Sequence, residues 1–128
     1  MAFGFHAELV DVDEVAARLS FLDRNDETSE HYFIMDRSEL SPEGSVPNMG
    51  DVYIERDDQC WGGYGGIDRV ILERNCLTLR LGPHTANQLG GHDEIRIAFD
   101  LREAEFDQLM RVLGFIMRGH ENQLECHD

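Results

Sequence analysis

The sequence contains no lysine: all eleven of its basic residues are arginine, against twenty-six Asp and Glu. The formal net charge is −15 at pH 7, and the excess is greatest in residues 1–58, which hold fifteen acids and four arginines. An acidic surface repels phosphate backbones, so no nucleic-acid partner is expected. It speeds encounter with a basic protein partner, although the same excess also serves solubility alone.

Long apolar runs are also missing. The apolar stretches fall far short of the ~18 residues that a membrane helix needs, so no membrane partner is expected. The first residues lack the basic and apolar segments of a signal peptide. Three cysteines at wide spacing, Cys60, Cys76 and Cys126, are typical of reduced thiols rather than of a disulfide framework. Together these features predict a cytoplasmic protein.

Spacings typical of a metal site are absent as well, because no His or Cys recurs at the compact intervals of zinc ligands. The nearest grouping lies in the tail, at His120, Cys126 and His127. We therefore expect no metal and no cofactor. Cys60 as a nucleophile, with His84 or His92 as its base, is an alternative to the commoner role of a lone cysteine as a small apolar residue.

The residues that are present predict a single α+β domain over residues 1–128, with a flexible tail at about 120–128. Period-two alternation and β-branched or aromatic content indicate a mostly antiparallel, meandering sheet. Its expected strands are residues 3–12, 15–22, 31–36, 51–56, 67–73, 77–81 and 95–99. Val15, Leu19 and Leu22 also have helical spacing, so a helix is the alternative for residues 15–22. Proline and glycine between residues 38 and 50 predict a long loop.

Two helices are expected beside this sheet. Gly82-Pro83 opens a short helix that ends near residue 90. Asp100, with an acid three residues later, has the pattern of a capping box. Apolar residues then recur at intervals of three and four until Gly119, which ends the helix. We expect this second helix, residues 100–118, to pack on one face of the sheet.

The stretch from Trp61 to Gly66 contains four glycines and two aromatic residues. Glycine permits positive φ and close backbone approach, and the aromatic rings need a surface on which to pack. A phosphate loop would require a Lys, a Ser or Thr and a following helix, which are missing here. We interpret the stretch as a tight connection inside the sheet, with a ligand loop as the alternative.

An acid cluster of Glu55, Asp57 and Asp58 precedes Trp61 and Tyr64. Acids beside Trp and Tyr have the composition of a protein-binding hot spot, so we predict these five as partner-binding residues. A solvated strand end is the plainer interpretation of the acids. Grouped carboxylates also serve glycosidases and Mg²⁺ enzymes, but only in a convergent geometry that a sequence does not show. We predict no catalytic residues.

The run from Val52 to Leu72, with Tyr-Gly-Gly-Ile at its centre, resembles the central segment of a family of bacterial immunity proteins from polymorphic toxin systems. Three later stretches also resemble segments of that family: His84–Leu89, Ile95–Phe99 and Phe106–Leu109. The likeness covers roughly residues 31–118.

This resemblance implies an α+β protein that binds and neutralises a cognate toxin and that offers no catalytic residue to carry over. The acidic surplus agrees with a basic toxin, such as a nuclease whose active site an acidic surface covers. Two alternatives belong to other classes. One is a homodimeric structural or regulatory subunit that pairs through an open sheet edge. The other is a small enzyme that uses Cys60 or the acid cluster.

Overall fold

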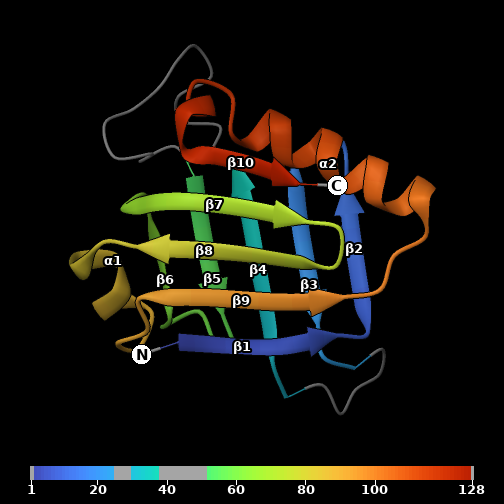
Figure 1. The fold of residues 1–128 in the computed structure, drawn as a ribbon. Helices are drawn as coiled ribbons and strands as arrows, with labels where there is room; N and C mark the ends of the chain where they lie inside the picture. Colours follow the sequence, from blue (N-terminus) through green and yellow to red (C-terminus); the bar gives the residue numbers. More distant parts are fainter. Residues whose placement is uncertain (1, 25–29, 38–51, 128) are drawn as a thin grey trace.

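Two five-stranded β-sheets make up most of the fold in the computed structural model, which describes residues 2–24, 30–37 and 52–127. The strands are β1 (Ala2–Ala7), β2 (Leu9–Asp13), β3 (Arg18–Leu22), β4 (Tyr32–Arg37), β5 (Val52–Arg56), β6 (Gly62–Tyr64), β7 (Ile67–Glu73), β8 (Cys76–Leu81), β9 (Glu94–Phe99) and β10 (Leu124–His127). The helices are α1 (Pro83–Gln88), α2 (Glu103–Ile116) and a short 3-10 helix, η2 (Glu121–Gln123). The predicted α+β class is confirmed, and Figure 1 shows the strands of the two sheets crossing one another.

The sequence predicts one meandering sheet, whereas the structure forms two. Strands β2 to β6 make an antiparallel meander in chain order, which we call the meander sheet. The second sheet has the order β1-β9-β8-β7-β10, with a parallel pair at each edge. The chain changes sheet at Glu8 and again at Gly65 and Gly66, so the predicted strand at 3–12 is two strands in different sheets. Alternation does not reveal this, because it records the faces of a strand and not its neighbours.

One hydrophobic core lies between the two sheets. Phe21 on β3 stacks on Phe99 of β9 with ring centroids 6.0 Å apart, and Phe33 on β4 lies 6.3 Å from Phe21. All three side chains are almost completely buried. Burying an aromatic side chain of this size contributes roughly 1.5–3 kcal/mol, so these contacts are a principal tie between the sheets.

Helix α2 begins later than the sequence predicts. Its N-cap is Arg102 rather than Asp100, and the capping acid is Glu105, whose Oε1 accepts the backbone N–H of Arg102 at 3.0 Å. The reason is that Leu101 packs against the core and separates the end of β9 from the first helical turn. The predicted apolar stripe is present from Phe106 onward, and it packs against β2 and β3 (Figure 1).

The tail also differs from its prediction. Instead of a flexible segment at 120–128, His120 is buried, η2 follows it, and β10 pairs in parallel with β7. The side chain of Gln123 donates from Nε2 to the carbonyl of Ile67 at 2.9 Å, and Arg69 pairs with Glu125. The tail therefore forms an edge strand of the second sheet, a long-range pairing that local composition does not signal.

The predicted strand at 15–22 is shorter in the structure, because β3 begins only at Arg18. The carboxylate of Asp13 accepts the backbone N–H groups of Val15 and Ala16, both at 3.0 Å, and so forms a turn before the strand. Asp side chains commonly hold such turns.

The short helix predicted after Gly82 is confirmed as α1. The loop predicted for residues 38–50 lies outside the described residues. Within the described part of the chain, no helix is long and apolar enough to cross a membrane.

Candidate partner-binding surface

The meander sheet has one face toward the core and one face away from it. Residues such as Leu19, Phe33 and Ile54 point inward and are fully buried, so their strand neighbours point outward. We call this outward face the tyrosine face. It consists of Leu9, Asp11, Asp13, Arg18, Ser20, Leu22, Tyr32, Ile34, Asp36, Tyr53, Glu55, Gly62 and Tyr64.

Glu55 lies at the centre of the tyrosine face between two tyrosine hydroxyls. Tyr32 donates to its Oε2 at 2.5 Å and Tyr53 donates to its Oε1 at 2.6 Å. Burial, and then the hydrogen bond to Glu55, raises the pKa of both tyrosines well above 10. Gly62 lies opposite Glu55 on β6, and a Cβ there would clash with the Tyr53 hydroxyl. We call the arrangement of Glu55 between the hydroxyls of Tyr32 and Tyr53 the carboxylate clamp. Glycine at position 62 leaves room for it.

Aromatic and apolar side chains surround this clamp. The ring of Tyr64, which is 56% exposed, lies 4.9 Å from the ring of Tyr53. Beside Tyr32 there is a shallow groove of about 220 Å³, lined by Ser20, Leu22, Tyr32 and Ile34. The tyrosine face thus combines a carboxylate, exposed aromatic surface and an apolar hollow, which is the composition of many protein interfaces.

The structure does not bring the five predicted binding residues together. Glu55 and Tyr64 lie on the tyrosine face, but Trp61 lies elsewhere: the guanidinium of Arg56, which points toward the core side, is 5.2 Å from the Trp61 ring and 4.7 Å from the Phe3 ring. Positions 61 and 64 are an odd number of residues apart in a nearly extended segment, so their side chains leave opposite faces.

Asp57 and Asp58 lie in the turn that follows β5. Asp57 accepts the backbone N–H of Tyr32 at 3.0 Å and contacts Arg56 and His31 at 3.0 and 3.1 Å, so it holds the turn to β4. Asp58 accepts the backbone N–H of Cys60 at 3.0 Å, and this bond lowers its pKa. Both acids therefore have structural partners.

The glycine stretch allows close packing between the sheets and α1. A Cβ at Gly63 would clash with the side chain of Gln88, and one at Gly66 would clash with Thr85. Thr85 also donates from Oγ1 to the carbonyl of Gly65 at 2.9 Å. The prediction of a tight connection across this stretch is wrong for residues 62–64, which form the edge strand β6, and only Gly65 and Gly66 join the two sheets.

The alternative nucleophile Cys60 is exposed, and desolvation together with the Asp58 carboxylate raises its pKa. A reactive cysteine normally has the opposite shift. The proposed base His92 lies against Phe3, with ring centroids 5.6 Å apart, and burial lowers its pKa. Among the described residues, no group of three His, Cys, Asp or Glu side chains has the geometry to hold a metal ion.

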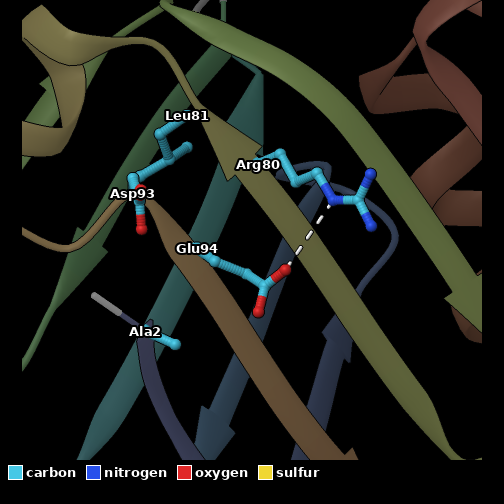
Figure 2. Close-up of a pocket in the computed structure, with 5 residues that line it drawn as sticks. All are labelled: Ala2, Arg80, Leu81, Asp93 and Glu94. Atoms are coloured by element: carbon cyan, nitrogen blue, oxygen red, sulfur yellow. Dashed lines mark ion pairs between the residues drawn. The ribbon is translucent and has the colours of Figure 1, made fainter.

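The outward face of the second sheet differs in charge from the tyrosine face. Its three glutamates are matched by three arginines. Arg80 and Arg96 both contact Glu94, at 3.7 and 3.9 Å, and Arg69 contacts Glu125. Figure 2 shows Arg80 and Glu94 beside a pocket of about 430 Å³, which is also lined by Ala2, Leu81 and Asp93.

The sequence interpretation did not identify Tyr32 and Tyr53 as residues of the candidate surface. Tyr53 is two residues before Glu55 in a strand, so their shared face could have been inferred from alternation. Tyr32 reaches Glu55 only through the pairing of β4 with β5, which sequence spacing does not give.

No curated protein is detectably similar to the chain. A family model described as Immunity protein 10 matches residues 5–107, a span from within β1 to the first turns of α2. This match includes Val52–Leu72, His84–Leu89 and Ile95–Phe99, which resemble immunity proteins of toxin systems. It extends the likeness toward the N-terminus and ends at residue 107 rather than near 118. The chain therefore belongs to the Immunity protein 10 family.

Proposed function

We propose that this chain binds and neutralises a cognate bacterial toxin through the tyrosine face. Membership of an immunity protein family supports the general role. The choice of surface rests on one observation, the contrast in charge between the two outward faces.

That contrast is large for two sheets of equal size. The tyrosine face carries four acids, Asp11, Asp13, Asp36 and Glu55, against the single arginine Arg18. The outward face of the second sheet carries three glutamates and three arginines, and two of the glutamates, Glu94 and Glu125, pair with those arginines. Uncompensated charge beside exposed aromatic rings favours a partner of opposite charge, whereas a balanced face gains little from one.

A basic toxin fits this surface, and a nuclease is the simplest example. An enzyme that binds nucleic acid presents cationic side chains around its active site, so an acidic protein surface can cover that site as a mimic of the substrate backbone. In this proposal Glu55 and Tyr64 make central contacts. Asp57, Asp58 and Trp61 lie beside the face and contribute less, chiefly by holding the neighbouring turn.

The test is protection of bacterial cells that express the toxin. A variant of the tyrosine face, Asp11→Asn with Asp36→Asn and Glu55→Gln, is compared with a variant of the second sheet, Glu73→Gln with Glu94→Gln and Glu125→Gln. Each variant removes three negative charges, so net charge is matched. Loss of protection in the first variant alone supports the proposal; equal loss or full protection in both contradicts it.

The homodimer remains a second candidate because β1 is a six-residue edge strand of the second sheet. Pairing through this edge would leave the tyrosine face free, so dimerisation and toxin binding are compatible. Sedimentation over a range of protein concentrations distinguishes a monomer from a dimer. The expected cytoplasmic location, and the expected lack of nucleic-acid and membrane binding, remain predictions.

A further inference from the structure

We infer that Glu55 is the receptor for an arginine side chain of the protein partner, and that the apolar groove beside it takes an apolar side chain next to that arginine. This inference rests on the proposed function, because it assigns the chemistry of the segment that the tyrosine face binds. The partner feature is a basic residue flanked by apolar ones on a protein surface.

The first reason is that Glu55 is a buried carboxylate with no cationic partner in the described part of the chain. Glu55 is 9% exposed, and its carboxylate accepts hydrogen bonds from the hydroxyls of two neutral tyrosines, Tyr32 and Tyr53. Other partly buried acids are paired: Asp36 with Arg18 at 3.2 Å, and Asp57 with Arg56 at 3.0 Å. Burying a carboxylate without a counter-charge is costly, so a cation that arrives with a partner relieves that cost.

The second reason is the geometry that the two tyrosines leave. Each carboxylate oxygen of Glu55 accepts one hydroxyl, and an ionised carboxylate has about four acceptor positions, so both oxygens retain capacity. A planar guanidinium donates two parallel N–H groups to the two oxygens of a carboxylate. The ammonium group of lysine offers no such pair, which favours arginine over lysine.

The third reason is the surface around the carboxylate. Tyr53 and Tyr64 lie side by side at 4.9 Å, and aromatic faces attract a guanidinium. On the other side of Glu55, the groove next to Tyr32 is lined mainly by apolar atoms of Leu22, Tyr32 and Ile34. An arginine that reaches Glu55 therefore places a neighbouring apolar residue of the same segment over the groove.

A second copy of this chain is a poorer occupant. Two tyrosine faces brought together would oppose four acids on each side, with only Arg18 on each face to offset them. Like charges across an interface cost affinity, so self-association through this face is disfavoured.

The experiment is a nuclear magnetic resonance titration of the full chain with a blocked peptide, acetyl-Leu-Arg-Leu-amide, at constant ionic strength. The control peptide replaces arginine with citrulline, which has nearly the same shape but no charge. We expect saturable shifts in the ring signals of Tyr32, Tyr53 and Tyr64, and roughly tenfold weaker binding of the citrulline peptide, because charged hydrogen bonds are about twice as strong as neutral ones.

Variants test the assigned residue. Glu55→Gln should weaken binding of the arginine peptide by about tenfold, whereas Glu94→Gln on the second sheet should change it by less than about twofold. Tyr64→Leu keeps the carboxylate clamp and removes only the exposed ring, so it should weaken binding by roughly threefold and serves if Glu55→Gln does not fold. Shifts that are absent, that centre on the second sheet, or that persist unchanged in Glu55→Gln overturn the inference.

This outcome is separable from that of the proposed function, because the titration contains no toxin. If the tyrosine-face variant loses protection but the arginine peptide does not bind, toxin binding through the tyrosine face is supported and the assignment of Glu55 as an arginine receptor is wrong. If the peptide binds at Glu55 but the tyrosine-face variant still protects cells fully, Glu55 does bind arginine and the proposed toxin-binding surface is wrong.

Discussion

Arg37 on β4 holds the C-terminal end of helix α2. Its Nη1 donates to the carbonyl of Ile116 at 3.1 Å and to the carbonyl of Arg118 at 2.6 Å, and the residue is only 7% exposed. The last carbonyls of a helix have no hydrogen-bond donor within the helix and carry partial negative charge. A buried arginine at this end supplies the donor and also offsets the charge. The meander sheet and α2 are thereby tied by hydrogen bonds as well as by apolar packing.

Replacing Arg37 with Met should therefore destabilise the protein by about 2–4 kcal/mol, because one buried and one partly buried carbonyl lose a charged donor. Urea unfolding measures this. Arg80→Met is the matched control, since Arg80 is exposed and its 3.7 Å contact with Glu94 is a surface ion pair worth at most about 1 kcal/mol. Similar losses in the two variants would show that the Arg37 contacts add nothing.

Gly90 and Gly91 offer a second matched pair. Both have positive φ, 85° and 87°, so alanine costs conformational strain of roughly 1 kcal/mol at either position. A Cβ at Gly90 would also clash with the guanidinium of Arg56, whereas nothing lies within 4 Å of one at Gly91. We expect Gly90→Ala to lower the free energy of unfolding more than Gly91→Ala. Equal losses would mean that Arg56 moves aside without cost.

The raised pKa values of Tyr32 and Tyr53 predict a loss of stability in alkali. Below pH 10 both residues are protonated in the folded and the unfolded chain. Above pH 10 the unfolded chain loses these protons while the folded chain keeps them, so the free energy of unfolding falls as pH rises toward the folded pKa values.

Glu55→Gln removes one of the causes of this shift. Ultraviolet titration of tyrosinate in the folded variant should therefore show Tyr32 and Tyr53 ionising at lower pH than in the wild type, although still above 10 because burial is the larger cause. Tyr53→Phe identifies which step belongs to which ring. An identical titration curve in Glu55→Gln would contradict the clamp.

The pairing of β10 with β7 predicts that the tail contributes to stability. Truncation after His120 removes this strand and the Gln123 bond to Ile67, and we expect a loss of about 2–4 kcal/mol from backbone hydrogen bonds and the partial burial of Leu124. Glu125→Gln, which breaks the ion pairs with Arg69 and His127 but leaves the strand in place, should cost less than about 1 kcal/mol. Hydrogen exchange gives an independent measure: amides of β10 that exchange as fast as an unstructured peptide would argue against the strand.

Local pattern was sufficient for several of the elements, but not for the strands β6 and β10 or for the assembly of the sheets. The strands β7, β8 and β9 and the stripe of α2 follow from alternation and from three-four spacing, because each depends on residues within one segment. The division into two sheets depends on where Glu8 and Gly66 turn the chain, and the order β10 beside β7 joins residues far apart in sequence. Neither the change from one sheet to the other nor the pairing of β10 with β7 produces a periodic pattern in the sequence.

The candidate site was also only partly predictable from the sequence. The shared face of Tyr53 and Glu55 follows from their separation of two residues, and the opposite directions of Trp61 and Tyr64 follow from their separation of three. The approach of Tyr32 to Glu55 requires the register of β4 against β5, and the lack of a cation near Glu55 requires the position of every arginine described. Those facts come only from the fold.

The most direct test of the account is the affinity of the toxin for the two matched variants as a function of salt. The toxin is first isolated with the wild-type protein from the source cells. We expect the variant of Asp11, Asp36 and Glu55 to bind at least about tenfold more weakly with a flatter salt dependence, while the variant of Glu73, Glu94 and Glu125 stays within about twofold of wild type. Equal affinities and equal salt slopes in the two variants would contradict binding through the tyrosine face.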